Sequence, residues 1–137
     1  MSSRREARER ALGLCYELEV RAVDVDTFLA ELPMPPDPYA EALVRGVAEH
    51  ESEIDELLTK YSEHWAVDRM PAIDRAVLRI GCFELGWMPE LSSAVVLNEA
   101  VDLAKEYSTK DSGRFVNGLL ARVSDHVRGA DSSEAVS

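Results

Sequence analysis

The chain has 137 residues, a mass of 15.2 kDa and a formal net charge of −11. This length fits one globular domain, and 46% apolar with 30% charged residues excludes a disordered or low-complexity chain. The charge excludes a protein that holds nucleic acid with its whole surface, although a local basic patch remains compatible with it. Apolar runs are far shorter than the roughly 20 residues of a membrane span, so we expect no membrane contact and a cytoplasmic location.

Helical periodicity runs through almost every segment, which predicts an all-α fold of about six to seven helices. The expected helices span residues 3–21, 24–32, 38–62, 71–88, 92–107 and 111–128. Ser3 is the predicted N-cap of the first helix, and Pro71 suits the first turn of the fourth. That fourth helix is apolar around much of its circumference, so it is predicted to be central. Residues 1–129 form the predicted domain, and residues 130–137 are expected to be a disordered tail.

The sequence lacks the common motifs of enzymes and metal sites. Cys15 and Cys82 have no metal-like spacing and are predicted to be small buried hydrophobic side chains. His50-Glu51 begins like a zinc-protease motif, but Ile54 stands where the second histidine is required. There is no nucleophile elbow, phosphate-binding loop or dinucleotide fingerprint. We therefore expect no enzyme activity, no cofactor and no metal.

The N-terminal segment opposes the charge of the rest of the chain. Residues 1–10 hold four arginines and two glutamates, a net charge of +2, so the remainder carries −13. On a helix, Arg5 and Tyr16 fall about 20° apart. Arginines beside an aromatic ring are typical of sites for single-stranded nucleic acid. A solvated basic helix start with a half-buried Tyr16 explains the same residues, so both interpretations stay open. Likewise, the acidic outer face of residues 38–62 is either a solvated surface or a docking surface.

Ordered sequence blocks are more specific than these patterns. The chain contains REARERA at 5–11 with Tyr16, DRAVLRI at 74–80 with Glu84, NEAVDLAKEY at 98–107 and DSGRFVNG at 111–118. This set, which covers nearly the whole chain, resembles the NusB family of bacterial transcription antitermination factors. The resemblance implies a single compact all-α domain arranged as two small helical bundles. It also implies a non-enzymatic factor that binds boxA-type RNA of ribosomal RNA leader transcripts together with the ribosomal protein NusE.

The resemblance also implies roles for individual residues and partners. Such a factor would join the RNA polymerase antitermination complex and promote ribosomal RNA synthesis. The residues matching the RNA surface are Arg4, Arg5, Arg8 and Arg10 as phosphate contacts, Tyr16 and Phe115 as stacking groups, and Asp111. Asp74 and Glu84 match the block associated with the ribosomal-protein partner. Asn98, Asn117 and Gly118 are expected to be structural, with buried amides capping helix ends, although RNA contact stays open.

Two other functions are compatible with parts of the sequence. In the first, the chain is a homodimeric interaction module whose arginine-bearing first helix packs against an acidic face of a second copy. In the second, it resembles the helical domain fused to ribosomal RNA methyltransferases, but 137 residues leave no room for the catalytic domain.

Overall fold

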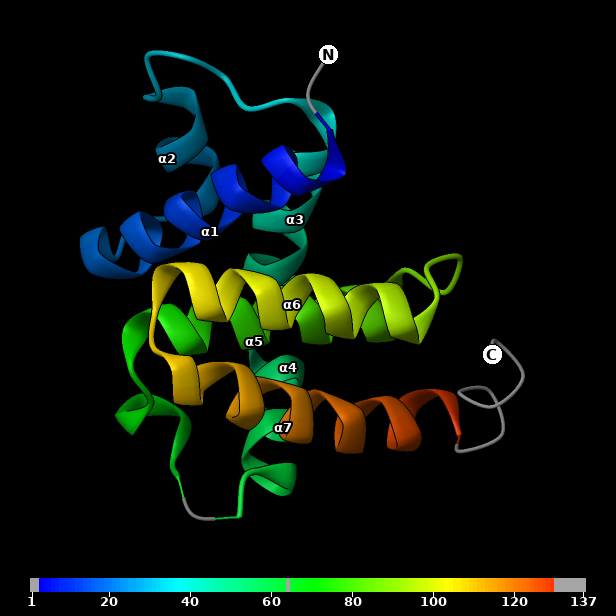
Figure 1. Cartoon of the computed structure of the whole chain (residues 1–137). Helices are drawn as coiled ribbons and strands as arrows, with labels where there is room; N and C mark the ends of the chain where they lie inside the picture. Colours follow the sequence, from blue (N-terminus) through cyan, green and yellow to red (C-terminus); the bar gives the residue numbers. More distant parts are fainter. Residues whose placement is uncertain (1–2, 64, 130–137) are drawn as a thin grey trace.

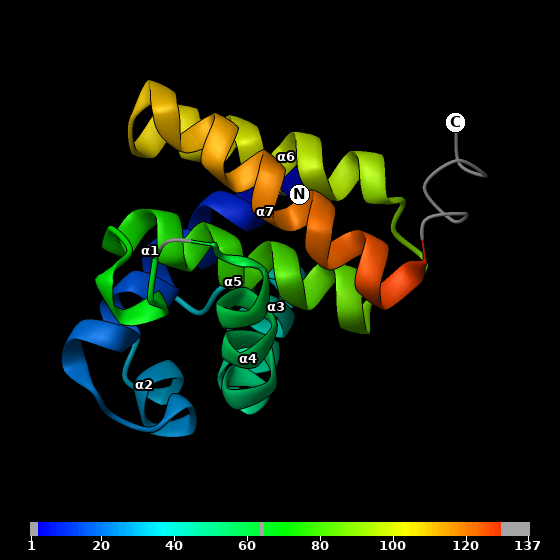
Figure 2. The ribbon, with the colours of Figure 1, turned by 90° about the horizontal axis from the view of Figure 1, so that it is seen from below.

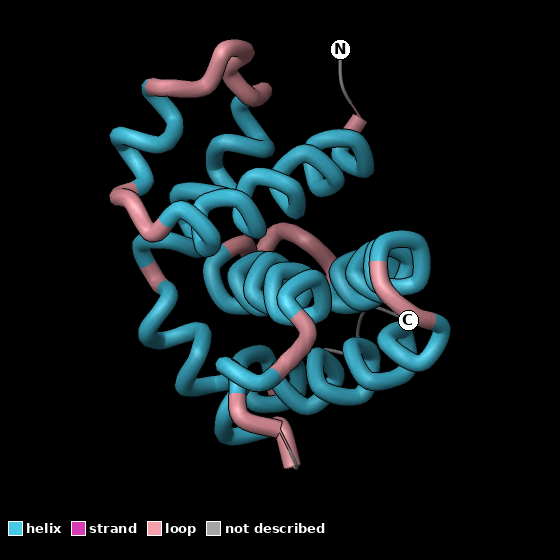
Figure 3. The backbone as a smooth tube through the Cα atoms, turned by 90° about the vertical axis from the view of Figure 1, so that its left-hand side faces the viewer, coloured by secondary structure: helices cyan, strands magenta, loops and turns pink. Residues whose placement is uncertain are grey.

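The computed structural model describes residues 3–63 and 65–129. These residues form helices joined by loops, and no strand occurs among them (Figure 3). The elements are α1 (Arg4–Arg21), α2 (Val25–Ala30), α3 (Pro38–Glu49), α4 (Glu51–Tyr61), a 3₁₀ turn (Val67–Arg69), α5 (Ala72–Trp87), α6 (Ser93–Tyr107) and α7 (Lys110–Arg128). The predicted all-α fold is confirmed. The predicted tail over residues 130–137 lies outside the described residues.

Polar side chains cap the start of several helices. The Ser3 hydroxyl accepts a hydrogen bond from the Glu6 amide at 3.0 Å, and the Glu6 carboxylate accepts one from the Ser3 amide at 3.2 Å. This reciprocal pair is a capping box, and it confirms Ser3 as the N-cap of α1. Ser92 caps α6 in a similar way, by accepting from the Val95 amide. Pro71 lies at the N-cap of α5, one residue before the predicted position.

The single long helix predicted over residues 38–62 is wrong. At His50 the backbone leaves helical geometry, with φ −112° and ψ 19°, and separates α3 from α4. The His50 ring stacks on Trp87 of α5 at a centroid distance of 4.4 Å. The break lets α3 pack on α1 while α4 packs on α7. No proline or glycine marks the position, so periodicity alone could not detect it.

Helix α5 is the centre of the molecule, as predicted. It contacts α1, α3, α4, α6 and α7. Viewed from below, α6 and α7 lie together on one side of α5, and α3 and α4 lie on the other (Figure 2). α5 is buried along most of its length, including two carboxylates, Asp74 and Glu84. No helix within the described residues is long and apolar enough to cross a membrane.

The crossing of α3 over α5 depends on Gly46. A β-carbon built at this position overlaps the ring of Phe83, which is 9% exposed. We expect Gly46→Ala to lower the free energy of unfolding by about 1–3 kcal/mol, because overpacking forces the ring or the helices apart. Urea unfolding checks this value. Gly13→Ala is the matched control: a β-carbon there meets nothing within 4 Å, so better helix propensity should add about 0.5–1 kcal/mol. Equal effects of the two substitutions would contradict the packing argument.

Candidate functional site

The first turns of α1 form the basic end of the molecule, where the arginines differ in environment. Arg4 is exposed, and its guanidinium carbon lies 4.2 Å from the centre of the Tyr39 ring, a cation–π distance. Arg10 is partly exposed and donates a hydrogen bond from Nη2 to the Met34 carbonyl oxygen at 2.7 Å. Both side chains lie at the surface, which the predicted phosphate contacts require.

Arg8, in contrast, is only 3% exposed. Its Nε and Nη2 atoms each lie 2.9 Å from Oε2 of Glu84, which is 1% exposed. The Tyr39 hydroxyl donates to the same oxygen at 2.5 Å, and burial together with Glu84 raises the pKa of Tyr39, so that the phenol remains a donor. The roles predicted for Arg8 with RNA and for Glu84 with a protein partner need exposed surface, which both lack. The fold instead makes them an internal ion pair between α1 and α5.

Arg5 has a third environment, at the boundary between α1 and α6. Its Nη atoms lie 3.4 Å from Glu99, 3.5 Å from Asp102 and 3.3 Å from Glu106. Close by, the Tyr107 hydroxyl donates to the Glu9 carboxylate at 2.8 Å. These contacts hold residues 4–10 of α1, its basic edge, against α6 as far as the C-terminal end of α6. The two helices lie one above the other in Figure 1.

A hollow of about 340 Å³ opens where α6 ends and α7 begins. It is lined by Trp65, Pro71, Asp74, Ser108, Thr109, Asp111, Ser112 and Phe115. The Trp65 and Phe115 rings lie 6.1 Å apart with a tilt of 45°, and Trp65 is 48% exposed. Phe115 is partly buried, so the exposed Trp65 ring beside it offers the main surface on which a nucleobase can stack. The hollow therefore brings together the predicted residues Asp111 and Phe115 and adds Trp65, which the sequence analysis missed.

Asp74 gives this hollow a buried carboxylate. The residue is 4% exposed, and its Oδ2 accepts a hydrogen bond of 2.9 Å from the Ser112 hydroxyl. Its Oδ1 has no hydrogen-bond partner in the structure. A buried acceptor without a donor costs about 1–3 kcal/mol, so an N–H or O–H donor entering the hollow would gain that energy. Any contact of Asp74 with a partner has to be made through the hollow, because the carboxylate has almost no open surface.

Tyr16 lies away from the lining of the hollow. It is 43% exposed and shares one face of α1 with Val20, which is 68% exposed. These two side chains form an apolar strip on the surface of α1. The predicted stacking role of Tyr16 stays a prediction, and the strip suits a protein contact equally well.

The expectation of buried, capping amides is wrong. Asn98 and Asn117 are exposed and lie inside α6 and α7 rather than at their ends. Gly118 is partly exposed, and a β-carbon there would lie 3.6 Å from Nη1 of Arg122, an ordinary contact. The two amides therefore remain available for contact with a ligand.

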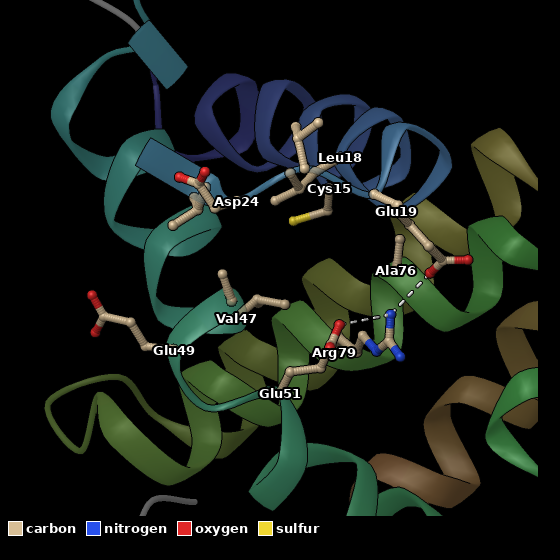
Figure 4. A pocket seen from close by; sticks show the side chains of 13 residues that line it. Cys15, Leu18, Glu19, Asp24, Val47, Glu49, Glu51, Ala76 and Arg79 are labelled. Atoms are coloured by element: carbon tan, nitrogen blue, oxygen red, sulfur yellow. Dashed lines mark hydrogen bonds and ion pairs between the residues drawn. The ribbon is translucent and has the colours of Figure 1, made fainter. Parts of the chain in front are cut away.

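A second hollow, of about 520 Å³, lies between α1, α3 and α5 (Figure 4). Cys15 points into it, and its rim carries Glu19, Glu49 and Glu51. Burial raises the pKa of the Cys15 thiol to about 12, so the thiol is protonated at neutral pH. Cys15 is partly buried, and Cys82 is buried. The prediction of a small buried hydrophobic side chain is confirmed for Cys82, whereas Cys15 packs against the core but is only partly buried. Among residues 3–63 and 65–129, no three His, Cys, Asp or Glu side chains are grouped to hold a metal ion.

Comparison with known proteins identifies the family of this chain. The model of the NusB family matches residues 5–125. The chain belongs to the NusB family. A NusB transcription antitermination protein from Streptomyces avermitilis is 46% identical over 134 residues, covering 91% of this chain and 93% of that protein. One from a Nocardioides species is 46% identical over 127 residues, covering 90% of this chain and 94% of that protein.

Solved structures of NusB proteins share the fold. Thermotoga maritima NusB is 31% identical with a TM-score of 0.85, and the match covers 97% of this chain and 98% of that one. A NusB crystallised with NusE and double-stranded RNA is 29% identical with a TM-score of 0.77, covering 90% and 96% of the two chains. The alignment of nearly whole chains confirms the predicted single NusB-like fold.

Proposed function

We propose that this chain is a non-enzymatic transcription antitermination factor that binds boxA-type RNA of ribosomal RNA leader transcripts together with NusE. The main support is that the basic edge of α1 adjoins the aromatic hollow. The Tyr107–Glu9 hydrogen bond brings the basic edge of α1 to the end of α6, and the next two residues, Ser108 and Thr109, line the aromatic hollow. Positive charge for phosphates thus lies beside a stacking platform for bases. The relative crystallised with NusE and RNA supports the same pair of partners.

The protein partner fits the charge of the rest of the molecule. Outside residues 1–10 the chain carries −13, which favours a basic protein and repels RNA away from the α1 edge. NusE is therefore the proposed partner, with the RNA polymerase antitermination complex as the larger assembly. The apolar strip of Tyr16 and Val20 and the unpaired Oδ1 of Asp74 are two positions where such a partner could anchor.

The homodimer is less well supported by the structure. That hypothesis pairs the arginines of α1 with an acidic face of a second copy. Arg5 already has three carboxylates of its own chain within 3.5 Å, and Arg8 is buried on Glu84. Sedimentation at micromolar concentration, with and without RNA, tests the dimer directly. A dimer that dissociates as RNA binds would show that the arginine edge is the dimer interface.

The decisive experiment is a titration of labelled single-stranded boxA RNA with the protein, repeated with NusE present. We expect weak binding by the protein alone and tighter binding with NusE. A double-stranded RNA of the same sequence and an unrelated single strand serve as comparison ligands. Arg5→Ala should weaken binding, whereas Lys60→Ala, which removes an exposed cation on α4, should not. Failure of the folded protein to bind boxA RNA under both conditions would refute the proposed function.

The salt dependence of this binding reports how many arginines meet phosphate. Single-stranded RNA loses affinity with a slope of log K against log salt of about −0.7 per phosphate contact. With Arg8 held by Glu84, three arginines remain, namely Arg4, Arg5 and Arg10. We therefore expect a slope of about −2 in a titration between low and physiological salt. A slope near zero would exclude the electrostatic contact, and one of about −3 would mean that a fourth cation besides these three meets phosphate.

A further inference from the structure

Three carboxylates of α6 form a ladder beside the basic edge of α1. Glu99, Asp102 and Glu106 are spaced by three and four residues, so they lie on one face of α6. The Arg5 guanidinium is 3.3–3.5 Å from an oxygen of each one. In the folded protein, carboxylates thus occupy the positions around Arg5 that phosphate oxygens would take in an RNA complex.

The exposure of these ion pairs makes them exchangeable. The side chains of Arg5, Asp102 and Glu106 are 35%, 54% and 50% exposed. Exposed pairs change an equilibrium constant by about one- to fivefold, because water and salt screen them. The Arg8–Glu84 pair differs, because its side chains are only 4% and 2% exposed. A phosphate can therefore replace the ladder at Arg5, whereas it has no access to Arg8.

We propose that the Glu99–Asp102–Glu106 ladder competes with RNA phosphates for Arg5 and thereby lowers the affinity of the RNA site. This inference rests on the proposed function. When Arg5 turns to a phosphate, it exchanges one anionic partner for another, so the net electrostatic gain is small. An RNA that offers only phosphates gains little from this exchange. An RNA that also stacks bases on Trp65 and Phe115 has a second source of binding energy.

The test removes two charges of the ladder by Asp102→Asn with Glu106→Gln. Glu99 is left in place because it also lies 3.4 Å from Arg8. The matched control, Glu56→Gln with Asp125→Asn, removes two exposed charges from α4 and α7. RNA affinity is measured by titration of boxA RNA and of an unrelated single strand of equal length, with NusE present. We expect the ladder variant to bind both RNAs about threefold to tenfold more tightly and the control to stay within about twofold of the original protein.

The same substitutions in an Arg5→Ala background separate competition from general repulsion. If the ladder acts by holding Arg5, its removal should gain less than about twofold once Arg5 is absent. An equal gain with and without Arg5 would overturn the proposal in favour of simple repulsion between carboxylates and RNA. An unchanged affinity of the ladder variant, when Arg5→Ala weakens binding, would overturn the ladder and leave the proposed function standing. Absence of boxA binding by every folded variant and by the original protein would refute both.

Discussion

Glu84→Ala should lower the free energy of unfolding by about 3–5 kcal/mol, because it removes the closest, buried carboxylate of Arg8 and leaves the partly exposed Glu99 at 3.4 Å as the remaining one. The Tyr39 hydroxyl loses its acceptor as well. The measurement is urea unfolding followed by circular dichroism at neutral pH. Glu31→Ala is the matched control, since its exposed pair with Arg21 at 3.0 Å should cost less than about 1 kcal/mol.

A second variant separates the role of Arg8 in folding from a role in RNA binding. Arg8→Met combined with Glu84→Leu removes both buried charges, and similar pairs replaced by apolar residues have been neutral or stabilising. We expect this variant to recover most of the stability lost in Glu84→Ala and to bind RNA like the original protein. A loss of RNA affinity as large as that of Arg5→Ala, in the folded double variant, would show that Arg8 contacts RNA.

The second large effect concerns the aromatic hollow. Trp65→Ala and Phe115→Ala should each weaken boxA RNA binding by about 1–3 kcal/mol, the usual contribution of stacking on one base. Because the two rings lie 6.1 Å apart in one hollow, they would contact the same or adjacent bases, and the double variant should lose less than the sum. The measurement is the same RNA titration with NusE present.

Control variants test whether a loss of RNA binding arises from the hollow. Phe115 packs against the core, so Phe115→Leu is included as a variant that keeps apolar volume while removing the flat ring. Met34→Ala removes an apolar side chain that is 68% exposed and lies outside the hollow lining, and it should leave binding unchanged. If Tyr16→Ala weakens binding and Trp65→Ala does not, the bases stack on α1 and the hollow is not the base site.

Much of the fold follows from local sequence. Ser3 predicts the N-cap of α1, and the apolar circumference of residues 71–88 predicts the central position of α5. These features depend on neighbours a few residues apart. At the break, the His50 ring instead stacks on Trp87, a residue far along the chain. Such a break has no local signature, and the periodicity on both sides of it remains helical.

In the candidate site, too, local motifs predicted some residues, and only tertiary packing brings in the others. Motif blocks placed Asp111 and Phe115 on one surface, and the structure brings both into the hollow. Trp65 could not be assigned, because only folding brings its loop next to α7. Arg5 and Arg8 look alike in the sequence, three residues apart on one helix. Their partners come from α6 and α5, and those helices decide which arginine is buried.

The sequence by itself determined the helical class, the family and a charge distribution in which a +2 N-terminal segment opposes a −13 remainder. Those properties are sums over residues or patterns of near neighbours, so the sequence is enough to determine them. Only the tertiary structure decided how much of that positive charge is free. Burial commits Arg8 to Glu84, and the exposed ladder on α6 holds Arg5 loosely. The strength of an ion pair depends on its access to water, and water access exists only once the helices have packed.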